Sequence, residues 1–138
     1  MGTMRLPVRV LLVEDHTLFR ESLARLLQHA DSDMQVVEAA GWEQALEWLA
    51  RHGAADLALV DLALPRMAGK SSLERLREQW PAMPVVALSV DDSPATVTAA
   101  LDRGAAGFVA RSTTAQDMLK ALRVVVVLAR GMPVPAMP

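Results

Sequence analysis

The sequence predicts a three-layer α/β domain whose middle layer is a parallel sheet of five strands. Five short apolar segments alternate with five segments in which apolar residues recur at helical spacing. Right-handed crossovers place such helices on both faces of one parallel sheet. With 138 residues, of which 52% are hydrophobic, the chain is long enough for one buried core and too short for two ordinary domains.

Composition narrows the range of functions. A net charge of −2 gives no bulk electrostatic reason for nucleic acid binding by this segment. The chain has no cysteine, which excludes a disulfide framework and a thiolate zinc site. No apolar run approaches the roughly 20 residues of a membrane span, and the N-terminus lacks the pattern of a signal peptide. We therefore expect a cytoplasmic protein without membrane contact.

The predicted strands are apolar almost throughout, as is typical of a parallel sheet covered on both faces. They span residues 8–13, 34–39, 56–61, 84–89 and 106–110. The second segment is the least apolar of the five, which favours a place near an edge of the sheet.

The first three predicted helices carry recognisable start and stop signals. The first begins at a cap on Thr17 and ends near residue 29, and the second begins at Trp42 and stops at Gly53. Ser71 or Ser72 caps the third helix, which two prolines close off near residue 80.

The last two predicted helices differ in how much apolar bulk they carry. The fourth begins at Pro94, ends at Gly104 and is rich in alanine, so we expect it to be loosely anchored. Thr113 or Thr114 caps the fifth. The run 124–127 consists of valines that favour a strand by propensity, yet it continues a helical pattern in phase, so we predict helix.

Two of the predicted strands end in carboxylates. Glu14 and Asp15 follow the first strand, and Asp61 ends the third. Each acid alone could be a helix cap or a solvated strand end. If the two strands are neighbours, however, the acids meet at the carboxyl edge of the sheet, where open α/β sheets place their sites. Their mutual repulsion would raise at least one pKa unless a cation lies among them, and Mg²⁺ is the natural occupant.

Five short motifs, in order and at matching spacing, resemble the receiver domain of two-component response regulators. They are Leu12-Val-Glu-Asp-His16, Glu38-Ala-Ala-Gly-Trp-Glu-Gln-Ala-Leu46, Leu59-Val-Asp-Leu-Ala-Leu-Pro65 with Gly69, Ala87-Leu-Ser89, and Leu101-Asp-Arg-Gly-Ala-Ala-Gly-Phe-Val-Ala-Arg111. The resemblance covers nearly the whole chain. It implies a flavodoxin-like (βα)5 fold with the strand order 2-1-3-4-5.

The resemblance also implies a phosphoryl-transfer site. Asp61 would be the nucleophile that accepts a phosphoryl group from a sensor histidine kinase. Glu14, Asp15, Asp61 and the backbone carbonyl of Ala63 would hold Mg²⁺. Such a domain is not an enzyme beyond catalysing its own phosphotransfer and dephosphorylation.

Three further positions take roles from the resemblance. Ser89 would bond a phosphoryl oxygen, and Phe108 occupies the place of an aromatic switch residue. Arg111 stands where the family carries a lysine that contacts the phosphoryl group, and the two side chains are not interchangeable at a tight site. Val90 stands where the family prefers a small residue that lets phosphate approach.

The segments 16–23 and 107–112 look most like the subfamily with a C-terminal LuxR-type helix-turn-helix. We accordingly expect an N-terminal tail (1–7), a receiver domain (8–130) and the start of an interdomain linker or a disordered tail (131–138). DNA would be contacted only through a domain absent from these 138 residues. The competing interpretation is a natural single-domain receiver.

Two other functions and a homodimeric state are also compatible with the sequence. A pseudo-receiver would work as an interaction or dimerisation module without phosphorylation. A phosphohydrolase with an aspartyl nucleophile usually has a second Asp two residues after the first, where this chain has Ala63. In the last helix, apolar residues cover more of the circumference than one buried face requires, so we expect a second face to pack against a partner subunit in a homodimer. These apolar residues are Val124, Val126, Val127 and Leu128.

Overall fold

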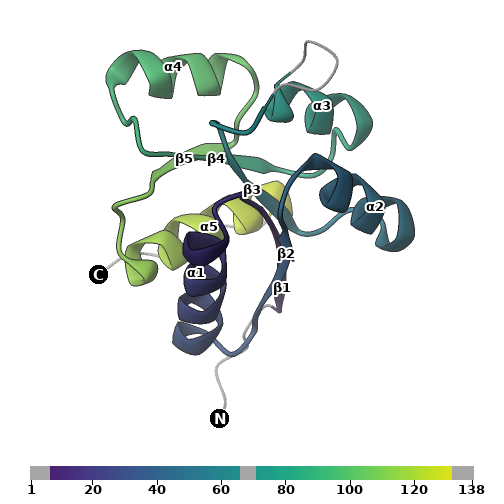
Figure 1. Ribbon diagram of the computed structural model, residues 1–138, viewed down its shortest axis with the longest axis vertical. Coiled ribbons are helices and arrows are strands. Elements are labelled where there is room, and N and C mark those ends of the chain that lie inside the picture. Colours follow the sequence, from purple (N-terminus) through teal and green to yellow (C-terminus); the bar gives the residue numbers. More distant parts are fainter. Residues whose placement is uncertain (1–6, 66–70, 132–138) are drawn as a thin grey trace.

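The computed structural model describes residues 7–65 and 71–131, which form one parallel sheet between two layers of helices (Figure 1). The strands are β1 (Val8–Val13), β2 (Met34–Ala39), β3 (Leu57–Asp61), β4 (Val85–Ser89) and β5 (Gly107–Ala110). Their order is β2-β1-β3-β4-β5, and every neighbouring pair is parallel. The predicted fold class, strand order and edge position of β2 are confirmed.

The helices alternate with the strands as predicted. They are α1 (Thr17–Ala30), α2 (Trp42–His52), α3 (Ser72–Gln79), α4 (Pro94–Asp102) and α5 (Ala115–Ala129). Helices α1 and α5 cover one face of the sheet, and α2, α3 and α4 cover the other (Figure 1). The valine run of the last segment is helical, which confirms that phase along a capped helix outweighs strand propensity. Among the described residues, no helix is both long and apolar enough to cross a membrane.

Each sheet face has its own hydrophobic core, because successive side chains of a strand point to opposite faces. On the α2–α4 side, Leu11 and Val60 pack with Leu49 and Leu76. On the opposite side, the alternate strand positions pack against α1 and α5. This second core includes Leu12 and Leu59 of the strands and Leu27, Met118 and Leu122 of the helices. Apart from the exposed Arg9 near the start of β1, the strands β1 and β3 are therefore apolar up to their carboxyl ends, where Glu14 and Asp61 stand.

Helix capping follows the predicted pattern with one correction. Ser71, Ser93 and Thr114 each accept a hydrogen bond from a backbone N–H of the first turn. Thr17, however, is the first residue of α1 and not its cap. The cap is His16, whose Nδ1 accepts the N–H of Phe19 at 3.3 Å. An unprotonated imidazole nitrogen can play the acceptor role usually filled by a hydroxyl or carboxylate.

Helix α4 is the least anchored element. Ala100 is its one buried residue, and Leu101 is largely exposed. Alanine contributes little apolar area, so burial holds this helix weakly. The structure thus bears out the expectation of a loosely attached fourth helix. The predicted Gly69 of the loop before α3 and the predicted tail after Gly131 lie outside the described residues.

Candidate functional site

The sheet topology brings three carboxylates together. Val13 of β1 pairs with Val60 of β3, so Glu14 and Asp61 occupy adjacent positions at the carboxyl edge. Asp15 follows Glu14 into the loop, and oxygen atoms of all three acids lie within 4.8 Å of one another. Glu14 is fully buried and Asp61 is 4% exposed, whereas Asp15 is open to solvent. The sequence-based expectation that these acids converge is therefore met.

The buried carboxyl groups of Glu14 and Asp61 interact unfavourably when both are charged. Burial, followed by the neighbouring Asp61, raises the pKa of Glu14 from its ordinary value of 4.5 to about 7. Glu14 Oε1 accepts the N–H of His16 at 2.9 Å, but Oε2 is buried without a hydrogen-bond partner among the described residues. Asp61 Oδ1 accepts the N–H of Ala63 at 2.8 Å. A buried carboxylate oxygen left without a partner is costly, so this arrangement favours a cation at the site.

The donor set fits a hard divalent cation. Mg²⁺ prefers carboxylate and carbonyl oxygens and usually retains several waters, which matches two buried acids beside an exposed one. No sulfur or imidazole belongs to the acidic cluster. Glu14, Asp15 and Asp61 therefore have the chemistry and the proximity to hold Mg²⁺.

Arg111 reaches the acidic cluster from the end of β5. Its backbone N–H bonds the carbonyl of Ser89 at 2.9 Å, which sets the start of its side chain at the same edge. The guanidinium donates from Nη2 to Glu14 Oε1 at 3.2 Å and lies over the ring of Phe19, 4.0 Å from the ring centroid. The side chain is 22% exposed. Arg111 thus pairs with Glu14 in this structure.

Ser89 and Val90 lie at the end of β4, between the acids and Arg111 in the order of the sheet. Ser89 ends β4, next to β3, and is buried. Its hydroxyl oxygen accepts the N–H of Asp91 at 3.0 Å. Val90 is 72% exposed and lines a recess of about 390 Å³ together with Phe19 and Arg111. Val90 is therefore an exposed neighbour of Arg111, directly after Ser89.

Phe108 lies apart from the carboxylates, on β5 beyond β4. It pairs with Ala87 and is half-buried against the core on the α2–α4 side. Its ring is thus neither fully enclosed nor fully in solvent. The acids, Ser89 and Arg111 therefore lie at the carboxyl edge of the sheet, whereas Phe108 lies within β5, three positions before Arg111.

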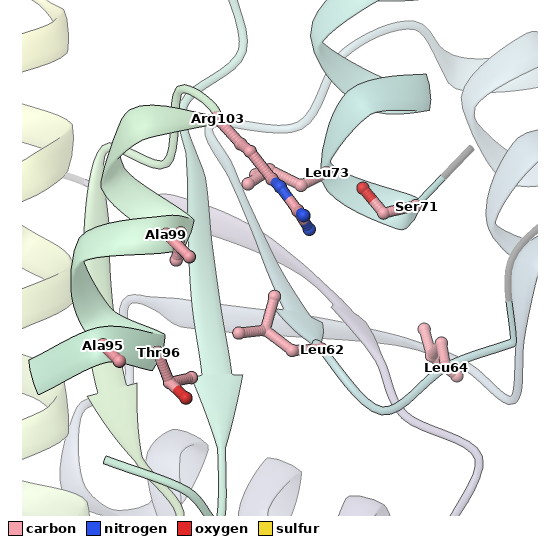
Figure 2. A pocket seen from close by; sticks show the side chains of 9 residues that line it. Leu62, Leu64, Ser71, Leu73, Ala95, Thr96, Ala99 and Arg103 are labelled. Carbon is pink, nitrogen blue, oxygen red and sulfur yellow. The ribbon is translucent and has the colours of Figure 1, made fainter. Parts of the chain in front are cut away.

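A hollow of about 320 Å³ separates α3 from α4 (Figure 2). Leu62 and Leu64, which follow Asp61, form its floor, and Ala95, Thr96 and Ala99 of α4 line one wall. Figure 2 shows the side chain of Arg103 extending into this space from the end of α4. The described side chains thus leave a hollow between α4 and the segment that follows Asp61.

Three residues that contact Glu14 or Arg111 were not identified from the sequence. Phe19 supports the guanidinium of Arg111, and Arg20 donates from Nη1 to the carbonyl of Glu14 at 2.9 Å. His16 donates its backbone N–H to the Glu14 carboxylate. All three follow Glu14 within six positions, and that proximity is the signal that could have identified them. Their contacts depend on the direction in which α1 leaves the sheet.

This combination of fold and site defines a class of protein: a flavodoxin-like α/β domain with a cluster of carboxylates at the carboxyl edge of its sheet. Within that class, the chain belongs to the response regulator receiver domain family, whose model matches residues 10–123.

Individual relatives agree with this assignment. The chain is 37% identical over 116 residues to the nitrate/nitrite response regulator protein NarL of Escherichia coli strain K12, covering 84% of this chain and 53% of that protein. It is 33% identical over 114 residues to the glycerol metabolism activator of Pseudomonas putida, covering 83% and 52%. The chain thus spans about half the length of these curated relatives.

Solved structures support the same family. The signal receiver domain of the response regulator NarL from Mycobacterium tuberculosis matches with a TM-score of 0.73 at 35% identity, covering 90% of this chain and 97% of that one. The predicted membership in the receiver family is confirmed.

Proposed function

We propose that this domain is a phosphoacceptor, in which Asp61 takes a phosphoryl group from a sensor histidine kinase in the presence of Mg²⁺. One observation carries the proposal: a buried Asp61 at the end of β3, with Glu14 and Asp15 within 4.8 Å. A carboxylate oxygen of Asp61 attacks phosphorus, the P–N bond of the phosphohistidine breaks, and the imidazole leaves with the electron pair. The product is an acyl phosphate.

The chain's own groups divide the remaining work. When bound, Mg²⁺ neutralises charge on the transferred group and orients it. Glu14, Asp15, Asp61 and the carbonyl of Ala63 are the proposed protein ligands. Ser89 turns its hydroxyl from the N–H of Asp91 toward a phosphoryl oxygen, and Arg111, at the end of the neighbouring strand, supplies a positive charge.

The proposed consequence is a rearrangement of α4 and its surroundings. Ser89 and Asp91 begin the loop that leads into α4, so a new bond to Ser89 pulls on that loop. The helix is anchored by one buried alanine and borders the hollow above Leu62 (Figure 2). Phe108, half-buried on the neighbouring strand, can then pack inward. The surface formed by α4, β5 and α5 is the proposed output surface.

The wider setting is proposed from the relatives. Residues 8–130 form the receiver unit and 131–138 begin a linker to a LuxR-type DNA-binding domain outside this sequence, in a cytoplasmic regulator of transcription. A homodimer through α5 is part of the proposal, although Val126 and Val127 are buried in the domain's own core. Leu128, which is 60% exposed, and the half-buried Val124 remain for a partner. Sedimentation that finds a monomer at high concentration, with and without a phosphoryl mimic, contradicts the dimer.

Intact-protein mass tests phosphoryl acceptance. The protein is incubated with a small acyl phosphate and Mg²⁺, beside the Asp61→Asn variant. The parent is expected to gain the mass of one phosphoryl group, and the variant is expected to gain none. If the folded parent gains nothing while a known receiver is modified in parallel, the domain is instead a pseudo-receiver that acts through protein contacts alone.

A further inference from the structure

The acidic site already contains a positive charge supplied by the chain. Arg111 Nη2 lies 3.2 Å from Glu14 Oε1, and the Glu14 side chain is fully buried. An ion pair with one fully buried partner is screened far less than a surface pair. Arg111 therefore neutralises part of the charge that would otherwise attract a metal ion.

The guanidinium is held in this position from two sides. Its central carbon lies 4.0 Å from the centroid of the Phe19 ring, a distance suited to a cation–π contact. Its Nε is buried without a hydrogen-bond partner among the described residues, so the group gives up one bond to keep the stacked pose. Lysine has no planar group to stack in this way, which distinguishes the contact from one that any cation would make.

From this geometry, and resting on the proposed function, we infer that Arg111 competes with Mg²⁺ for the negative charge of Glu14, so that the guanidinium weakens metal binding. Two positive charges, on the metal ion and on the guanidinium, repel each other at this distance. The metal-free site is thereby kept partly neutral, and the charge of Arg111 lowers the affinity for Mg²⁺.

Removing the charge of Arg111 tests the inference. Mg²⁺ is titrated into the metal-free protein by isothermal calorimetry, with no phosphodonor present. Arg111→Met and Arg111→Gln are each expected to bind Mg²⁺ at least about tenfold more tightly than the parent, because one positive charge beside the ion is gone. Both variants lack the positive charge, but only glutamine can still donate a hydrogen bond. Comparing them therefore separates the effect of charge from that of a lost hydrogen bond.

Arg20→Met is the matched control. Arg20 is also an arginine beside Glu14, but it contacts the backbone carbonyl and the carboxylate of Glu38. Its removal is expected to change Mg²⁺ affinity by less than about threefold, since the Glu14 carboxylate keeps its pair. Equal tightening in Arg20→Met and Arg111→Met would show a general field effect and overturn the inference.

The outcomes also separate this inference from the proposed function. If the parent binds Mg²⁺ but neither Arg111 variant binds it more tightly, the competition is refuted while the metal site stands. If neither the parent nor any variant binds Mg²⁺, both the inference and the proposed metal dependence fail. Circular dichroism on each variant confirms that folded protein is compared.

Discussion

Glu14 combines complete burial, an acidic neighbour and an arginine partner in one carboxyl group. Burial and Asp61 raise its pKa, while the backbone N–H of His16 and the charge of Arg111 lower it, and the net result is a value of about 7. The charge of this one side chain therefore depends on pH and on the position of Arg111.

The raised pKa predicts a pH dependence of stability in metal-free buffer. Between pH 4.5 and about 7 the folded state holds a proton on Glu14 that the unfolded state has released. The free energy of unfolding must then fall as pH rises through this window. Urea denaturation at a series of pH values, with a chelator present, measures the slope. Glu14→Gln is expected to have a flatter profile, and an identical slope in the two proteins would contradict the account.

Replacing Val90 by alanine is expected to change the rate of phosphoryl uptake without changing the stability of the domain. The side chain of Val90 is 72% exposed and directly follows Ser89 of the proposed phosphoryl site, so Val90→Ala removes bulk beside that site and changes the free energy of unfolding by less than about 0.5 kcal/mol. Quenched time courses with a small acyl phosphate are expected to show that Val90→Ala takes up the phosphoryl group roughly three- to tenfold faster than the parent. This corresponds to an activation barrier lower by about 0.6–1.4 kcal/mol. Leu18→Ala removes similar exposed bulk from α1 and should leave the rate unchanged. Equal rates for all three proteins would contradict a steric role of Val90.

At the residue scale, sequence patterns placed Glu14 and Asp61 at the sheet edge but did not identify Phe19 as a contact of Arg111. A carboxylate that ends an apolar strand must lie at the sheet edge, so Glu14 and Asp61 were predictable once their strands were taken as neighbours. The stacking of Arg111 on Phe19 joins residues 92 positions apart, since 111 − 19 = 92. That contact depends on how α1 packs against the sheet, which no local pattern encodes.

At the scale of elements, α4 depends on its cap more than the other helices do. The side chain of Asp91 accepts hydrogen bonds from Thr96 and from the backbone of Ser93, and these bonds lower the pKa of Asp91. Ser93 itself caps the helix by accepting the N–H of Thr96. With one buried alanine behind it, α4 has little apolar contact to hold it if this network is lost.

Ser93→Ala is therefore expected to loosen α4 selectively. Loss of an N-cap hydroxyl costs about 0.5–2 kcal/mol. Hydrogen exchange followed by mass spectrometry should show faster exchange of α4 amides while β3 and β4 keep their protection. Thr114→Ala removes the corresponding cap of α5 and provides the comparison, because that helix is also held by Met118 and Leu122. Exchange in α4 that is unaffected by Ser93→Ala would show that the cap is not its main anchor.

Element boundaries show where sequence patterns stop being informative. Ser71 and Thr114 were each one of two adjacent candidates for a cap, and neighbouring hydroxyls cannot be separated by propensity alone. The cap of α1 was assigned to Thr17 because threonine is a common cap, whereas His16 fills the position.

At the scale of the whole molecule, the fold was predictable because its strongest signals are periodic. Five apolar strands separated by amphipathic helices permit few arrangements once right-handed crossovers are required. The strand order itself came from resemblance to the receiver family, since several parallel orders satisfy the same alternation. The hollow between α3 and α4 could not be predicted, because it reflects the tertiary placement of two helices.

Two leucine substitutions test the two-sided core. Leu59 is fully buried on the side of α1 and α5, so Leu59→Ala is expected to cost about 2–5 kcal/mol of unfolding free energy. Leu26→Ala makes the same chemical change at an exposed site of α1 and should cost less than about 0.5 kcal/mol. Urea denaturation monitored by tryptophan fluorescence measures both. Similar costs at the two positions would contradict the described core.

The central claim is that Asp61 carries the phosphoryl group, and locating the modified residue tests it most directly. After incubation with a small acyl phosphate and Mg²⁺, reduction with borohydride converts a phosphorylated aspartate to homoserine, which peptide mass spectrometry can locate. The account predicts homoserine at position 61 in the parent and none in Asp61→Asn. Conversion at Asp15 or Asp56 instead, or no conversion in a folded protein, would contradict it.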